Sequence, residues 1–120
     1  MPIVRIDITG PKDTEYCSAV LSGVRSAISE LGAPDDRVTV RLIQIPAEQV
    51  DVPACRTDRF TIVDVMLYPG RTPEMKAACV AALRENLSAA PGIPACEISV
   101  AFHDMDPADL DVLPGEAHEQ

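Results

Sequence analysis

Residues 60–74 read FTIVDVMLYPGRTPE, and this stretch decides the fold. Residues 60–68 are almost all β-branched, aromatic or aliphatic, which is typical of a strand with apolar side chains on both faces. Gly70 then breaks the strand, and Thr72 is well placed to cap a helix whose first residue is Pro73. The stretch therefore predicts a strand, a break and a helix in direct succession.

A helix over residues 73–89 and a further strand complete this half of the chain. Apolar residues recur at helical spacing through the helix, and Gly92 and Pro94 end it. The apolar residues of the helix face are Val80, Leu83 and Leu87. The alternating apolar residues of the next strand are Ile98, Val100 and Phe102. The second half is thus a strand–helix–strand unit.

The first half shows the same order about sixty residues earlier. Residues 2–8 predict a strand, residues 14–31 a helix that Gly32 ends, and residues 38–45 a second strand. The matching pairs are Gly10 with Gly70, Val20 with Val80, Gly32 with Gly92, Pro34 with Pro94, and Val40 with Val100. One slip inside the helices pairs Val24 with Leu83 and Ile28 with Leu87. Preserved breakers at a fixed offset indicate a duplication.

We therefore expect one α/β (α+β) domain over residues 1–120, made of tandem β-α-β repeats at about 2–45 and 60–103. Each repeat is a right-handed unit with parallel strands, so the two give a four-stranded sheet with both helices on one face. Parallel strands are usually buried on both faces, as the apolar strand at 60–68 requires. A chain of 120 residues has no material left to cover the second face, which predicts subunit association.

Charge and composition exclude several classes of protein. The sequence has 19 acidic and 10 basic residues and a net charge of −9, which argues against a broad grip on nucleic acid or an anionic membrane. No apolar run approaches the roughly 20 residues that span a bilayer, and the first residues do not form a secretory signal. We expect a soluble cytoplasmic protein with an acidic tail from Asp104 onward.

The cysteines and histidines form no metal-binding pattern. The four cysteines have no CxxC spacing, and Cys17 and Cys79 lie on apolar helical faces, where a reduced thiol packs as a small hydrophobe. His103 and His118 do not complete a zinc ligand set. We expect no metal at the functional site.

Pro2 is a candidate catalytic residue whose chemistry depends on the removal of Met1. Methionine is usually removed before a small second residue, and the chain would then begin with a secondary amine. An α-amino group titrates near ~8, and burial in an apolar, cationic pocket lowers that value. A neutral amine near pH 7 is a good general base for proton transfer at carbon. If Met1 stays attached, the nitrogen is an amide and cannot act in this way.

Arginines near the predicted strand ends are candidates for binding an anion. Arg71 lies where a strand meets the free N–H groups of a helix, which suits a carboxylate. Asp36 and Arg37 enter the strand at residues 38–45, and alternation places Arg37, Thr39 and Arg41 on one face. That face is either an interface or a carboxylate site, and Arg37, Arg41 and Thr39 join Arg71 as candidate substrate-binding residues.

In these features the chain resembles the tautomerase superfamily, which includes 4-oxalocrotonate tautomerase, the chloroacrylic acid dehalogenases and malonate semialdehyde decarboxylase. The resemblance rests on the N-terminal MPIV strand, the sixty-residue β-α-β repeat, and the order of three short motifs. Malonate semialdehyde decarboxylase has the most similar layout of these motifs. They are GAPDDR (32–37), GRTPE (70–74) and DPADLDVLPG (106–115).

The resemblance implies a tautomerase fold, a homotrimer with active sites near subunit contacts, and chemistry without a cofactor. It implies that Pro2 is the amino-terminal base or acid. Arg71 matches the arginine that holds a substrate carboxylate beside the reacting carbon. Asp36 matches an aspartate that assists the proline or a water molecule.

The chain also departs from the family pattern. Pro69 replaces a second arginine of the decarboxylases, and Thr39 and Ser99 stand where short tautomerases have a strand arginine. In the first half, Lys12 follows Gly10-Pro11 where the second half has Gly70-Arg71, and this lysine is at best a partial substitute for the arginine. An aliphatic residue, Val50 or Leu110, replaces the aromatic wall, while Ala101 and Leu113 occupy the places of the dehalogenase acid and tyrosine. These changes disfavour hydrolytic dehalogenation.

Three hypotheses follow for the function. The leading one is a cofactor-free keto–enol tautomerase in which Pro2 is the base and Arg71 binds a small carboxylate. The second is a malonate semialdehyde-type decarboxylase or hydratase, in which protonated Pro2 acts as an acid with Asp36. The third is a trimeric binding protein that retains the fold without the chemistry.

Overall fold

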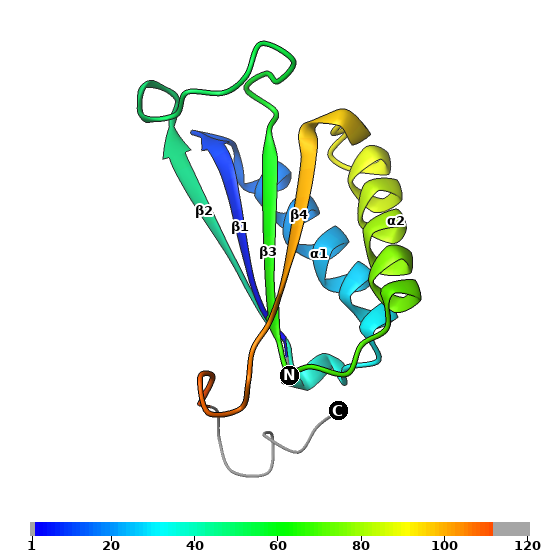
Figure 1. Ribbon diagram of the computed structural model, residues 1–120. Coiled ribbons are helices and arrows are strands. Elements are labelled where there is room, and N and C mark those ends of the chain that lie inside the picture. The colour runs from blue at the N-terminus through cyan, green and yellow to red at the C-terminus, as the bar shows by residue number, and fades with distance from the viewer. Residues whose placement is uncertain (1, 112–120) are drawn as a thin grey trace.

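The computed structural model describes residues 2–111, a sheet packed against two helices (Figure 1). The strands are β1 (Ile3–Gly10), β2 (Thr39–Pro46), β3 (Thr61–Leu67) and β4 (Ile98–Asp104). The helices are α1 (Thr14–Ile28) and α2 (Pro73–Ala89), with 3-10 turns η1 (Ser29–Leu31), η2 (Asp35–Arg37), η3 (Ala47–Gln49) and η4 (Ala95–Glu97). Within residues 2–111, neither α1 nor α2 could span a lipid bilayer. Met1 and the end of the predicted acidic tail lie outside this range.

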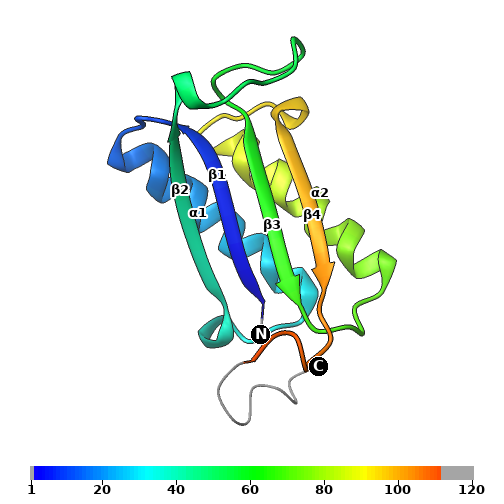
Figure 2. The same cartoon turned by 60° about the vertical axis from the view of Figure 1, so that its left-hand side comes forward.

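The strands lie in the order β2-β1-β3-β4, and the pairs within each half are parallel (Figure 2). The halves join through β1 and β3, which are antiparallel, with Ile3 beside Met66 and Asp7 beside Ile62. This arrangement confirms the predicted four-stranded sheet of two β-α-β units. It also places the start of β1 and the end of β3 at the same end of the sheet.

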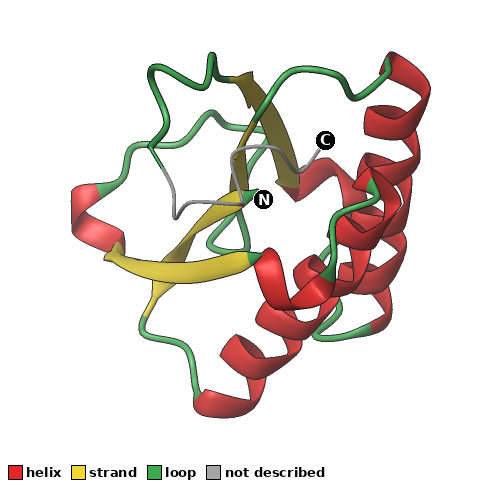
Figure 3. Ribbon diagram, turned by 90° about the horizontal axis from the view of Figure 1, so that it is seen from below, coloured by secondary structure: helices red, strands yellow, loops and turns green. Residues whose placement is uncertain are grey.

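Both helices cover one face of the sheet, as the sequence predicts (Figure 3). Gly23 of α1 gives room for their close contact, because a Cβ there would lie 3.0 Å from a methyl group of Leu87 in α2. Asn86 of α2 adds a hydrogen bond between the helices, since its Nδ2 donates to the carbonyl of Gly23 at 3.0 Å. The fully buried aliphatic residues include Val4, Ile6, Ile8, Val20, Val24, Ile28, Val63, Val65, Leu67, Leu83 and Leu87.

The helix ends follow local signals in the sequence. The Thr72 hydroxyl accepts a hydrogen bond from the N–H of Met75 at 3.2 Å, and Pro73 is the first residue of α2. The helix expected over residues 14–31 is less uniform than predicted. Its last turn tightens into η1 before Gly32 ends it with a φ of 76°.

The burial of side chains in the two helices corrects one of the residue pairs that were matched between the predicted repeats. Val20 is fully buried in α1, and its counterpart in α2 is the fully buried Cys79 rather than the half-buried Val80. The helices therefore match at an offset of 79 − 20 = 59 residues. Burial raises the pKa of the Cys79 thiol to about 11, so this thiol packs as a neutral group, as the sequence predicts.

The face of the sheet opposite the helices is open in the single chain. Ile62 is 38% exposed there, and Ile43 and Met66 are half-buried. Arg5 lies on the same face, with its Nε 3.0 Å from a carboxylate oxygen of Asp7. In the single chain this face therefore presents both apolar and charged side chains to solvent.

A buried carboxylate, Glu97, fixes the connection between β2 and β3 to the start of β4. Glu97 is only 3% exposed, and the backbone N–H of Thr57 donates to one of its oxygens at 3.0 Å. The Thr57 hydroxyl donates to the other oxygen. The hydrogen bond from this hydroxyl is the main cause that holds the pKa of Glu97 below its usual value.

We expect Thr57→Val to destabilise the fold at neutral pH and to lose this effect in acid. Glu97 titrates near ~4.3 in an unfolded chain, so its stabilisation is present above that pH and disappears as the pH falls through the lower, folded pKa. Urea unfolding at pH 7 should show a loss of about 1–2 kcal/mol, which shrinks in acid. Thr14→Val, at an exposed threonine of α1, is the matched control. An equal loss at both pH values would contradict this role of Thr57.

Candidate active site

Pro2 is buried at the end of the sheet where β1 begins and β3 ends. Thr39 is exposed, and its backbone N–H donates to the Pro2 carbonyl at 3.3 Å. Because Ile3 pairs with Thr39, Pro2 lies beside Val38. Continuing the strand register places Leu67 and then Asp104 in the same row across the sheet. Neighbouring strands lie about 4.8 Å apart, so Pro2 and Asp104 are roughly 10 Å apart along the row.

Arg71 is buried at the same end of the sheet, with only 8% of its surface exposed. Its Nε donates at 3.1 Å to the carbonyl of Leu31 in η1, and its Nη1 is buried without a hydrogen-bond partner among residues 2–111. Burial lowers the pKa of Arg71, an effect that the carboxylate of Asp104 opposes. A guanidinium stays charged at neutral pH, so this group is a buried cation with an unused N–H.

Lys76 and Asp104 form the outer part of the same corner. Lys76 lies in the first turn of α2, and its Nζ is 3.1 and 3.0 Å from the two carboxylate oxygens of Asp104. The same ammonium lies 5.8 Å from the centroid of the Phe102 ring. Lys76 is therefore a neutralised cation, unlike Arg71. We call the group of Pro2, Arg71, Lys76 and Asp104 the proline corner.

The segment after β4 folds over this end of the sheet. The fully buried Tyr68 donates from its hydroxyl to the carbonyl of Leu110 at 2.8 Å. Val50 lies at the opposite end of the sheet, in the connection between β2 and β3. Of the two residues predicted to replace the aromatic wall, Leu110 is thus the one near the proline corner of its own chain. Leu113 lies outside the described residues.

Asp36 and Arg37 lie in the turn η2, immediately before β2 and at the same end of the sheet. Arg25 of α1 holds this turn, because it donates to the carbonyls of Asp35 and Val38 at 2.9 and 2.8 Å. Asp36 is exposed and Arg37 is half-buried. The prediction that Arg37 continues the alternation of the strand is wrong, since a 3-10 turn has no pleat.

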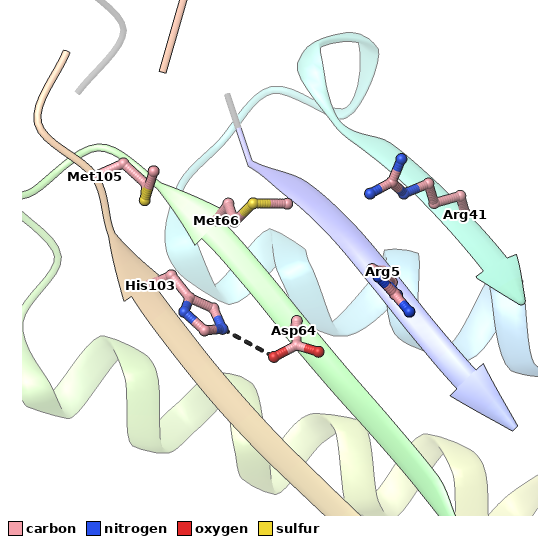
Figure 4. Close-up of a pocket in the computed structure, with 6 residues that line it drawn as sticks. All are labelled: Arg5, Arg41, Asp64, Met66, His103 and Met105. Atoms are coloured by element: carbon pink, nitrogen blue, oxygen red, sulfur yellow. Dashed lines mark hydrogen bonds and ion pairs between the residues drawn. The ribbon is translucent and has the colours of Figure 1, made fainter. Parts of the chain in front are cut away.

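Arg41 lies on the open face of the sheet, in the middle of β2, where it lines a shallow pocket of about 430 Å³ (Figure 4). It shares this face with Thr39, as predicted, but the structure does not bring it to Arg37. In the same pocket His103 Nε2 lies 2.8 Å from an oxygen of Asp64. The pocket is lined by Arg5, Arg41, Asp64, Met66, His103 and Met105.

The equivalent corner of the first half lies at the other end of the sheet. Lys12 donates from its Nζ to the carbonyl of Asp58 at 3.1 Å and from its backbone to the side chain of Gln44 at 2.7 Å. The hydroxyl of Ser99 accepts a bond from Arg56 at 2.7 Å. Lys12 and Ser99 therefore serve contacts within the chain, far from the proline corner.

A family model for tautomerase enzymes matches residues 36–110, more than half of the chain. The chain belongs to the tautomerase family. The match covers Asp36, Arg71 and the segment after β4 as far as Leu110. No curated protein matches this tautomerase-family sequence.

Solved structures with the same fold include three that are about a quarter identical in sequence. A fused 4-OT, described as a symmetric trimer, has a TM-score of 0.81 at 27% identity and covers 94% of this chain and 93% of that chain. An FG41 malonate semialdehyde decarboxylase inhibited by 3-bromopropiolate has a TM-score of 0.82 at 25% identity, covering 96% and 92%. A protein inactivated by 2-oxo-3-pentynoate has a TM-score of 0.82 at 26% identity, covering 94% and 93%. The fold is therefore the tautomerase fold.

Sequence reasoning missed Lys76 and Asp104 in this tautomerase-family chain. The two residues are 28 positions apart, and only the parallel register of β3 and β4 brings the end of β4 beside the first turn of α2. A lysine in the first turn of a helix is unfavourable for the helix dipole. That local conflict is the one signal in the sequence that singles out Lys76.

Proposed function

We propose that this protein is a cofactor-independent keto–enol tautomerase that uses the amine of Pro2 on a small keto or enol carboxylate. One observation carries the proposal: Arg71 is a buried cation with an unused N–H, at the end of the sheet where Pro2 is also buried. The family match and the likeness to a fused 4-OT support it.

The mechanism needs a free secondary amine, so it acts in chains from which Met1 has been removed. Burial and the positive charge of Arg71 both favour the neutral amine. Neutral Pro2 takes the proton of the enol hydroxyl and returns a proton to carbon at the other end of the conjugated system. The enol becomes a ketone, and the enzyme ends with the protons it began with. Arg71 binds the carboxylate and stabilises the negative charge that develops on the enolate.

Pro2→Ala should lower kcat/KM for the ketonisation of phenylenolpyruvate by roughly 10²–10⁴-fold, the usual contribution of a positioned general base. The intact mass of each sample must show that Met1 is absent. Pro53→Ala, at an exposed proline in the connection between β2 and β3, is the matched control and should keep full activity. Wild-type rates in Pro2→Ala, with an unchanged circular dichroism spectrum, would refute the role of Pro2.

Arg71→Ala should act mainly on KM. Loss of a charge-assisted bond to the substrate carboxylate should raise KM by roughly 10–100-fold, with a smaller effect on kcat. The variant also loses the bond to Leu31, so its stability should fall by about 1 kcal/mol, and urea unfolding must be measured beside the kinetics. Arg71→Lys should recover part of the KM, and Arg84→Ala, exposed on α2, should behave as wild type. An unchanged KM in Arg71→Ala would place the carboxylate elsewhere.

Decarboxylation or hydration of a malonate semialdehyde-like acid is the second candidate, favoured by the likeness to FG41 malonate semialdehyde decarboxylase. Here Pro2 acts as an acid, and Asp36 of η2 orients it or activates water. The pH dependence of kcat/KM separates the two candidates. A base must be neutral, so tautomerase activity falls as the pH drops through the titration of the amine. An acid must be protonated, so decarboxylase activity falls as the pH rises through it.

We infer also that other copies of the chain cover the open face in a homotrimer, as in the fused 4-OT trimer. Light scattering should give a mass of about 39 kDa, three times 12.9 kDa. Ile62→Asp places a charge in this face and should lower the mass toward that of the monomer. Ala81→Asp, on the exposed side of α2, is the matched control. A monomeric wild type at micromolar concentration would overturn the trimer.

A further inference from the structure

We propose that the proline corner selects substrates with a single carboxylate, and that Asp104 enforces this selection by holding Lys76. The inference rests on the proposed function, because it concerns the substrate class of the same site. It deepens that proposal by assigning roles to two residues outside the proton-transfer chemistry.

The first step is the availability of cations at this end of the sheet. Arg71 has a buried N–H with no partner among the described residues, whereas both carboxylate oxygens of Asp104 lie 3.0–3.1 Å from the ammonium of Lys76. Arg25 and Arg37, which lie at the same end of the sheet, also have interactions within the chain. One substrate carboxylate can therefore be bound by Arg71, whereas Lys76 is held by Asp104 and is not available for a second one.

The second step is the charge around the corner. The segment after β4 folds over this end through the bond from Tyr68 to Leu110. The described residues of this segment, 105–111, include exposed carboxylates and no lysine or arginine. These carboxylates are Asp106, Asp109 and Asp111. A second carboxylate on the substrate would approach these like charges, and such repulsion costs binding free energy.

The third step concerns the uncharged side chains near the proline corner. Leu110 is apolar and half-buried in the segment that folds over this end of the sheet. Such a side chain suits an apolar aryl or alkyl group on the substrate. The chemistry of the corner thus fits a 2-keto or enol acid whose remainder is uncharged.

The experiment compares kcat/KM for phenylenolpyruvate, a monocarboxylate, with that for 2-hydroxymuconate, a dicarboxylate. Wild-type enzyme should favour the monocarboxylate. Asp104→Asn releases Lys76, and we expect the dicarboxylate-to-monocarboxylate ratio to rise about three- to tenfold. Asp106→Asn removes one carboxylate charge two residues further along the chain but leaves Lys76 bound, so the ratio should change less than about twofold. A wild-type preference for the dicarboxylate, or equal effects of the two variants, would overturn the proposal.

A double variant tests the part assigned to Lys76. In Asp104→Asn combined with Lys76→Met, the gain for the dicarboxylate should disappear, because no second cation remains. A gain that persists would show that the charge of Asp104 acts directly, which would overturn the role of Lys76. Thermal melting of each variant shows whether it is folded at the assay temperature.

Binding measurements keep this inference separate from the proposed function. Titration calorimetry with cinnamate and fumarate, neither of which can enolise, reports carboxylate selection without turnover. Tighter binding of cinnamate, with the same response to Asp104→Asn, supports the selection even if neither substrate is turned over, an outcome that would refute only the tautomerase. Tighter binding of fumarate overturns the selection while leaving proton transfer by Pro2 intact.

Discussion

The antiparallel pairing of β1 with β3 is the constraint on which the rest of the structure depends. It joins two parallel β-α-β units into one sheet and sets Ile3 against Met66. Because the strands run in opposite directions, the chain segment that precedes β1 and the loop that follows β3 share one end of the sheet. A parallel junction would have placed Pro2 and Arg71 at opposite ends. The candidate chemistry therefore depends on how the two halves are joined.

The same junction places the loop after β1 and the loop after β3, which are equivalent in the two repeats, at opposite ends of the sheet. After β1, Lys12 is bonded to the carbonyl of Asp58, and the buried carboxylate of Glu97 at that end is bonded by Thr57. After β3, the buried Arg71 keeps an N–H without a partner among the described residues. The two corners therefore differ in the contacts of their cations: Lys12 is bonded within the chain, whereas one N–H of Arg71 has no partner among residues 2–111.

Local signals in the sequence predicted much of the fold. The helix predicted over residues 73–89 has the bounds of α2, because the cap at Thr72 and the apolar spacing act within one or two turns. The predictions for Val80 and for Arg37 failed for a different reason. Matching a repeat by sequence does not show which side chain faces the core, and the turn η2 ends the strand alternation before it reaches Arg37.

By itself, the sequence determined the two β-α-β units, their breaks and caps, and the residue types able to move a proton or bind a carboxylate. Tertiary structure decided which of those residues meet. Arg71 bonds to Leu31, 40 residues away, and Lys76 bonds to Asp104, 28 residues away. Such pairs depend on strand order and register, which are set by packing of the whole core. No local pattern encodes them, so the proline corner could be named in parts from the sequence and assembled only in the folded chain.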